Sequence, residues 1–422
     1  MSTDIKFYFS TNNNAPQLQN TYGSMIDVLD ACLVNGFGSQ TVSTLTASGT
    51  TVTATFGSAH NFMQYQVIKI VGATQTEYNG EFRILTVPNA NSITFKLAAV
   101  PSVTTATGTI TSSLPSLGWE KPFSSTNVNG GGKAAYRSKN TLLPSRPFLR
   151  VVDELDPAYS ATYAKYAKVG IVEDMTDINT MLGVQAPYDS ASPNKNWVGT
   201  GSETSGVNGW ARWYYAADRP VSGGLVNSLT PAAGNRQWIL VGNGDYFYIL
   251  PTTTVPSATV NTQHASAYGF GAFKSLLNAD NSCTFLQSHL TLSNNGTSVT
   301  AYFSLVSSVA ANSPLLLLRD YAQSANYKTA NCLSLNLTIA GSGASDAIGA
   351  STLTNTAPFA PVFIKEDATN VLRGQIKNLF WLFQQKPYSN FQLIEKDSAL
   401  YIAAFIASYS TLGQIVLKIG DL

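Results

Sequence analysis

Residues 22–38 read YGSMIDVLDACLVNGFG, and the rest of the chain is organised around this stretch. Its apolar residues recur at helical spacing, at Met25, Val28, Leu29, Cys32 and Leu33. This spacing predicts an amphipathic helix over residues 25–34, which Ser24 could cap and Asn35-Gly36 would end. A helix this short with a single apolar face must lie against a larger body.

That body is interrupted before it is complete. From Gly38 to Ile110 short runs of Thr and Val alternate, and turn residues separate them. The pattern predicts five strands, at residues 51–56, 66–71, 81–87, 92–97 and 107–111. Residues 39–112 are therefore predicted to form an inserted small β-barrel or β-sandwich module. Residues 1–38 and 113–422 would form the main body, which resumes at Gly118–Arg137 and could divide into two subdomains near residues 255–265.

The remaining sequence also favours strands. Residues 238–241 and 246–250 flank Gly242-Asn243-Gly244-Asp245, which predicts a hairpin. Residues 400–417 are apolar but contain a Ser-Thr-Leu-Gly turn, so they predict two strands and not a membrane span. Residues 175–182 suggest a short helix, and residues 373–385 fit either a helix or a buried strand. The expected fold class is mainly β, a sandwich or barrel body with one short N-terminal helix.

Composition excludes several classes of partner. Charged residues make up only 12% of the 422 residues, the net charge is +1 and the pI is about 7.6. A chain with so small a net charge has no strong electrostatic attraction to nucleic acid or to acidic lipid. Its first residues, MSTDIKFYFST, lack the pattern of a signal peptide. Three scattered cysteines, Cys32, Cys283 and Cys332, are too few for a disulfide framework or a metal knuckle, although a bridge between the last two stays open.

Two acidic runs are candidates for chemistry. Glu173, Asp174, Asp177 and Asn179 supply neighbouring oxygens, but the run lacks the signature of a calcium loop. The run Asp153-Glu154-Leu155-Asp156 is more simply interpreted as a surface loop. The sequence therefore predicts no catalytic residue, no cofactor and no metal site.

The densest aromatic patch surrounds Arg212. It consists of Trp210, Trp213, Tyr214 and Tyr215. Aromatic side chains fill cores and protein interfaces, and they also stack on sugars. Because strand alternation would bury half of them, packing in a core or interface is favoured over a glycan contact. These four residues are the candidate interface or glycan-binding residues.

Several strings together resemble a group of structural proteins of tailed bacteriophages. They are residues 23–38, residues 118–123 (GWEKPF) with Tyr136-Arg137, residues 268–275 (YGFGAFKS), and residues 373–387. The inserted module, at residues 72–73, 78–80 and 106–110, resembles small β modules of phage particle proteins. The resemblance implies a virion protein that is assembled in the host cytoplasm and packs with other virion subunits as a homo-oligomer.

The leading hypothesis is thus a non-enzymatic structural component of a tailed-phage tail, baseplate or neck. A second hypothesis is a glycan-binding receptor or adhesin that recognises a host-surface glycan through Trp210, Trp213 and Tyr214. A capsid decoration protein and a tail-associated hydrolase of surface polysaccharide also stay open. Neither the glycan-binding protein nor the hydrolase has a sequence motif of its own.

Overall fold

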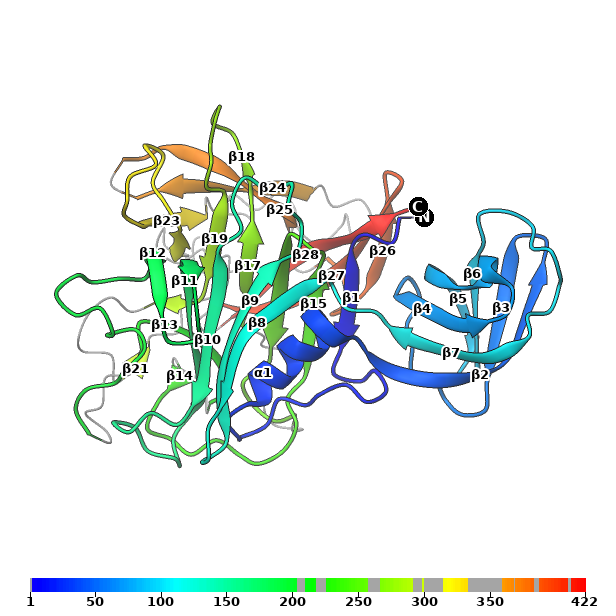
Figure 1. Ribbon diagram of the computed structural model, residues 1–422, viewed down its shortest axis with the longest axis horizontal. Helices are drawn as coiled ribbons and strands as arrows, with labels where there is room; N and C mark the ends of the chain where they lie inside the picture. The colour runs from blue at the N-terminus through cyan, green and yellow to red at the C-terminus, as the bar shows by residue number, and fades with distance from the viewer. Residues whose placement is uncertain are drawn as a thin grey trace.

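A computed structural model describes residues 2–202, 209–217, 225–256, 266–290, 298–299, 314–332, 359–367, 369–382, 387–408 and 411–422. Within these ranges the chain is mainly β, as the sequence predicts, with one short helix (Figure 1). No helix in the described part of the chain is long and apolar enough to cross a membrane. Cys32, Cys283 and Cys332 are all buried and free, so the Cys283–Cys332 bridge is not formed.

Two large antiparallel sheets build the body. In the described residues thirteen strands form the larger sheet, and β15 (Trp238–Gly242) and β16 (Tyr246–Pro251) form the predicted hairpin within it. The other strands on its path, in spatial order, are β1 (Lys6–Phe9) before the hairpin and then β17 (Tyr268–Ala272), β19 (Thr284–Gln287), β22 (Pro314–Leu317), β23 (Lys328–Cys332), β24 (Phe359–Glu366), β25 (Leu372–Leu382), β28 (Thr411–Asp421), β27 (Ala399–Ser408) and β26 (Leu393–Lys396), with β18 (Lys274–Ser275) beside β25. Strands from both sides of residues 255–265 pair directly in this sheet, β16 with β17.

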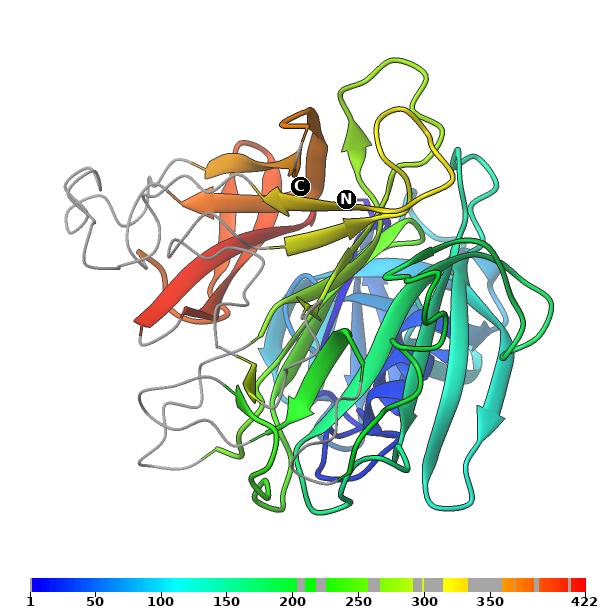
Figure 2. The ribbon, with the colours of Figure 1, turned by 90° about the vertical axis from the view of Figure 1, so that its left-hand side faces the viewer.

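The second sheet packs face to face on the first. It contains β8 (Trp119–Thr126), β9 (Gly131–Ser138), β10 (Phe148–Glu154), β11 (Lys165–Met175), β12 (Met181–Ala186), β13 (Ala211–Ala216) and β20 (His289–Leu290). Trp119 and Trp213 from this sheet contact Phe247 of the larger sheet edge-on, with ring centroids 5.5 and 6.0 Å apart. These contacts lie in one continuous apolar core, so the body is a β-sandwich. Figure 2 shows the sandwich after a 90° turn.

The N-terminal helix lies on this sandwich, as the spacing of its apolar residues requires. It comprises α1 (Ser24–Leu29) and a π-helical turn, η1 (Asp30–Asn35). Asp30 accepts a hydrogen bond of 2.8 Å from the Tyr136 hydroxyl and pairs with Lys121 at 2.5 Å. Both partners lie beyond the inserted module, so the helix and residues 118–137 complete each other.

The cap of this helix differs from the sequence prediction. Ser24 is the first helical residue, and its hydroxyl bonds the carbonyl of Thr21 instead of a helix amide. The Asp153 carboxylate accepts the Met25 N–H at 3.1 Å instead. A residue far along the chain thus replaces the local cap, because β10 places its carboxylate at the helix start.

The inserted residues form a closed six-stranded barrel in the described chain, in the order β2-β3-β6-β5-β4-β7. Its strands are β2 (Phe37–Ser48), β3 (Thr51–Phe56), β4 (Val67–Ala73), β5 (Gly80–Asn89), β6 (Ser92–Lys96) and β7 (Gly108–Leu114). Sequence periodicity missed β2, because a bulge between Val42 and Thr44 breaks its alternation. The barrel closes where β2 enters and β7 leaves, with Phe37 opposite Leu114.

The barrel stands beside the sandwich and is bonded to it (Figure 1). Arg83 on β5 is buried and donates to three backbone carbonyls, those of Ser2, Ile5 and Tyr65, at 2.7–2.9 Å. A Cβ at Gly420, near the other end of the chain, would lie 2.7 Å from the same guanidinium. Both ends of the described chain therefore meet the barrel at Arg83.

Two segments of the body, residues 175–182 and residues 373–385, were predicted as possible helices, and the strand pairing shows which form each takes. Residues 175–182 form no helix, because Met175 and Met181 pair across the turn between β11 and β12. Of the predicted range 373–385, residues 373–382 belong to the strand β25, the second of the two predicted forms, and residues 383–385 lie outside the described residues. The strands predicted within residues 400–417 are also present, as β27 and β28.

Candidate functional site

Three residues of the predicted aromatic patch have no accessible surface. Trp213, Tyr214 and Tyr215 are 0% exposed on β13. Trp213 and Tyr215 face the inter-sheet core, whereas Tyr214 packs on the opposite face against Tyr166. The expected interface or glycan contact is corrected for these three residues, because β13 is covered on both faces and not on one.

Their polar atoms are satisfied inside the protein. Trp213 Nε1 donates to the carbonyl of Gln287 at 2.8 Å, and the Tyr215 hydroxyl donates to Asp153 Oδ1 at 2.6 Å. The Tyr214 hydroxyl donates to Asn227 Oδ1 at 2.6 Å and accepts from Arg212 at 2.9 Å. These side chains therefore stabilise the packing of the body.

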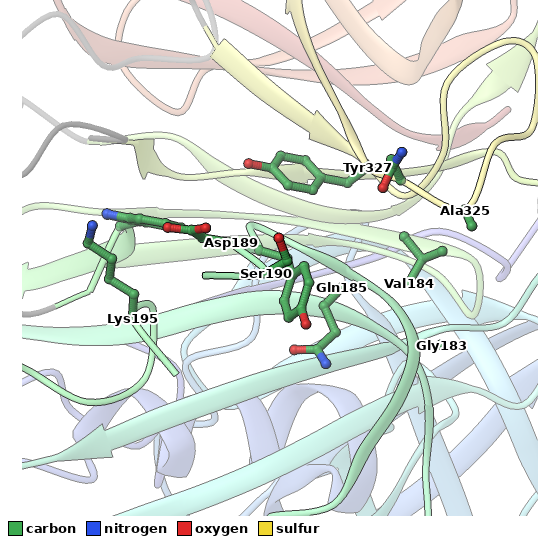
Figure 3. Close-up of a pocket in the computed structure, with 11 residues that line it drawn as sticks. Gly183, Val184, Gln185, Asp189, Ser190, Lys195, Ala325 and Tyr327 are labelled. Carbon is green, nitrogen blue, oxygen red and sulfur yellow. The ribbon is translucent and has the colours of Figure 1, made fainter. Parts of the chain in front are cut away.

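Trp210, the fourth residue of the patch, is placed differently. It precedes β13, is 5% exposed and lines a pocket with a volume of about 750 Å³ (Figure 3). Figure 3 shows Tyr327 on one side of the pocket and Gln185 on the other. The side chains that line it are predominantly aromatic or polar, and include Gln185, Tyr188, Asp189, Ser190, Lys195, Trp210, Asn326 and Tyr327.

One wall of the pocket comes from the segment between β12 and β13. Asn196, buried within it, accepts the backbone N–H groups of Trp210 and Ala211 at 2.9 Å each. The Asn196 amide also donates to the carbonyl of Val169 on β11. One side chain thus fixes the start of β13 and the neighbouring Lys195 relative to the sheet.

The opposite wall comes from the connection between β22 and β23. Arg319 pairs with Glu173 on β11, and the second oxygen of Glu173 accepts the Val184 N–H at 2.9 Å. Asp320 accepts from both the N–H and the hydroxyl of Ser324, at 3.0 and 2.7 Å. These bonds shape the connection that carries Tyr327 and tie it to β12.

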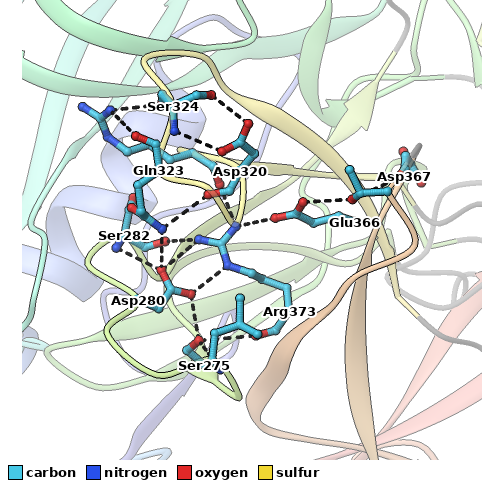
Figure 4. Close-up of polar contacts among 12 residues, drawn as sticks. Ser275, Asp280, Ser282, Asp320, Gln323, Ser324, Glu366, Asp367 and Arg373 are labelled. Carbon is cyan, nitrogen blue, oxygen red and sulfur yellow. Dashed lines mark hydrogen bonds and ion pairs between the residues drawn. The ribbon is translucent and has the colours of Figure 1, made fainter.

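A buried ion cluster is bonded to this connection (Figure 4). Arg373 on β25 donates to both oxygens of Asp280, at 2.7 and 2.9 Å, and to Glu366 at 2.5 Å. All three side chains are at most 2% exposed. Gln323 in the wall donates to Asp280 Oδ1 at 2.9 Å, and Arg373 donates to the carbonyl of Arg319 at 2.8 Å, so the cluster holds the connection at two points.

The pocket holds charged and titratable groups at its surface. The Lys195 ammonium lies over the Trp210 ring, 5.1 Å from its centroid. Asp189 Oδ1 accepts the N–H of Ala191 at 2.9 Å. Burial raises the pKa of Tyr327, the Tyr188 backbone N–H opposes the rise, and Asp189 adds to it.

Two polar atoms of the pocket residues lack hydrogen-bond partners among the residues that the structure describes. Trp210 Nε1, a donor, and Gln185 Oε1, an acceptor, are enclosed and make no hydrogen bond within the described chain. Most enclosed polar atoms in proteins are hydrogen-bonded, so each exception calls for an explanation. No motif in the sequence joins residues 183–195 with residues 325–327, and sequence analysis therefore missed this pocket.

The acidic run at residues 153–156 is not a surface loop as predicted. Asp153 is fully buried, and its burial raises its pKa to about 6 against the opposing hydrogen bonds from Tyr215 and three backbone amides. Asp156 is also buried and pairs with Lys168 at 2.7 Å. Hydrogen bonds and an ion pair from other elements offset the cost of burying these two carboxylates.

The second acidic run is used for local structure. Asp177 accepts the N–H groups of Asn179 and Thr180 in the turn between β11 and β12, and Glu173 pairs with Arg319. No group of three or more metal-ligating side chains occurs among the residues described.

Similarity to known proteins is weak and concerns structure alone. No protein-family model matches the chain, and the search of curated proteins found no match. Among solved structures, the chain is similar to "Phage phi92 endosialidase" at 10% sequence identity and a TM-score of 0.16. The match covers 91% of this chain and 51% of the endosialidase, so this chain spans about half of that protein. A TM-score this low does not establish a shared fold.

Proposed function

We propose that this chain is a non-enzymatic structural protein of a tailed-phage virion, built into a symmetric tail, baseplate or neck assembly. The resemblance of residues 23–38 and 118–123 to such proteins supports the proposal. A low share of charged residues also fits close packing of identical subunits.

The observation that carries the proposal is the fixed placement of the barrel beside the sandwich. Subunits in a closed assembly must present their contact surfaces at constant separation. Arg83 ties the barrel to the N-terminal segment, and Tyr65 adds a hydrogen bond to Glu395 of β26. The barrel also exposes valines that a neighbouring subunit could cover, at Val71, Val100 and Val103.

The direct test is mass spectrometry of purified particles of the phage that encodes the chain. We expect the chain at a fixed ratio to the other virion proteins, and particles that lack it would reject the proposal. A chromatography and light-scattering experiment on the purified protein then tests for the homo-oligomer.

A substitution sharpens this test. Val100→Asp on the barrel should reduce incorporation into particles without changing the unfolding temperature, because Val100 is 70% exposed. Val128→Asp in the β8–β9 turn, where the valine is 98% exposed, is the matched control. Equal incorporation of both variants would exclude the barrel surface around Val100 as a contact.

A glycan-binding receptor protein of the same particle is the second candidate function. The aromatic and polar lining of the pocket at Trp210 favours it over a capsid decoration protein and over a hydrolase of surface polysaccharide.

A further inference from the structure

We infer that the pocket between Trp210 and Tyr327 is a saccharide-binding site. The inference deepens the second candidate function, and it depends on the chemistry of the pocket and not on the proposal of a structural virion protein. The two proposals can therefore fail separately.

The size and lining of the pocket fit a small polar ligand. Its volume of about 750 Å³ lies within the range of about 300–1,000 Å³ that is usual for ligand pockets. A sugar ring has an apolar C–H face and a rim of hydroxyl groups. Tyr188, Trp210 and Tyr327 offer aromatic surface for the face, whereas Gln185 and Asp189 offer hydrogen-bonding atoms for the rim.

The unpartnered atoms point to the same class of ligand. Trp210 is only 5% exposed, and its Nε1 donor lacks a partner among described residues, as does the acceptor Gln185 Oε1. Both atoms are enclosed, so a ligand reaches them only when the side chains around them move. A sugar hydroxyl both donates and accepts, so neighbouring hydroxyl groups can then satisfy both kinds of atom. An apolar ligand would leave both atoms unsatisfied.

Lys195 is the movable element of the site. Its ammonium covers the Trp210 ring at 5.1 Å and forms no ion pair with any described residue. Since the side chain is partly exposed, a sugar that stacks on the ring can displace the ammonium. The displaced ammonium remains close enough to donate to the ligand's oxygens.

The backbone around the pocket is already held in place. Asn196 fixes the wall that carries Lys195 and Trp210, and the Arg319–Glu173 pair fixes the opposite wall. Binding therefore requires little ordering of the protein, which favours affinity.

The test uses the purified full-length chain and calorimetric titration. The probes are oligosaccharides of a neutral hexose, an N-acetylhexosamine and a hexuronic acid. We expect at least one probe to bind, and Tyr188→Ala to weaken that binding about tenfold by removing one stacking surface. Tyr188 is 38% exposed, so this variant should keep its fold.

A second variant separates a binding role from a structural one. Gln185→Ala removes an acceptor that has no described partner, so it should weaken binding without lowering the unfolding temperature. Tyr321→Ala, in the connection that forms the opposite wall but outside the pocket lining, is the matched control and should bind like the parent. The inference is overturned if no probe binds at millimolar concentration, or if Tyr188→Ala and Gln185→Ala both bind like the control.

Discussion

The buried cluster around Arg373 makes a quantitative prediction about stability. Replacing Arg373 by Met keeps most of the side-chain volume but leaves the carboxylates of Asp280 and Glu366 without their shared cation. Because these two side chains are 2% and 0% exposed, water cannot replace the lost donors. Removing one partner of such a buried pair typically costs about 3–5 kcal/mol, out of a total of about 5–15 kcal/mol for a native protein.

The pH dependence of this loss follows from Asp280. Burial raises the pKa of Asp280, but hydrogen bonds from Arg373 and Ser275 outweigh it and hold the pKa below its ordinary value. A depressed pKa means that the pair stabilises the fold above the unfolded value of about 4 and that this contribution fades as the pH falls. The deficit of Arg373→Met should therefore be largest at pH 7 and shrink towards pH 4, where the unpaired Asp280 is protonated.

Urea unfolding followed by tryptophan fluorescence measures this deficit, because Trp381 is buried on the same strand, β25. Lys418→Met, which breaks the partly exposed Lys418–Asp421 pair, is the control and should cost less than about 1 kcal/mol. A loss at Arg373 no larger than that of the control, or one that does not change with pH, would refute the reasoning.

Three further predictions concern other parts of the body. Arg83→Met should leave three backbone carbonyls unpaired. Amide hydrogen exchange should therefore speed up in β1 and around Tyr65, while the barrel strands stay protected. Uniformly faster exchange throughout the barrel would contradict this prediction. Gly72→Ala should cost at least about 2 kcal/mol in thermal unfolding, since its Cβ would lie 2.0 Å from the Thr109 carbonyl oxygen, whereas Gly49→Ala, also at positive φ but with open space, should cost less. Burial raises the pKa of Asp153 to about 6, so ionisation of this carboxyl lowers the stability of the fold as the pH rises from about 4 to about 6. In urea titrations, the stability of the parent relative to Asp153→Asn should fall by about 3 kcal/mol over that range. A difference that stays constant with pH would exclude this assignment.

Local patterns in the sequence predicted much of the fold. The hairpin around Gly242-Asn243-Gly244-Asp245 and five barrel strands are visible because turn residues and alternation occur within a few positions of each other. The strand β2 was missed because its bulge shifts the alternation by one residue. The helix cap was wrong because Asp153, which supplies it, lies more than a hundred residues away.

The candidate site was less accessible to sequence analysis. Aromatic density marked Trp210, which lines the pocket, but the same signal marked Trp213 and Tyr214, which are enclosed. Sequence cannot tell these cases apart, because the second face of β13 is buried in a cluster with Tyr159 and Tyr166, which are distant in sequence. The pocket brings Gln185 and Tyr327 together from distant parts of the sequence, and the Arg319–Glu173 pair links the connection that carries Tyr327 to β11, which pairs with the strand of Gln185, β12.

The pairing of Phe37 with Leu114 has a consequence for how such a chain can vary. The inserted barrel enters and leaves the body through two adjacent antiparallel strands, whose paired Cα atoms are typically about 5 Å apart. A tight turn could bridge that gap, or a different domain with neighbouring ends could be grafted there, without breaking the order of the sandwich strands. The junction is therefore a natural point for exchanging one projecting module for another.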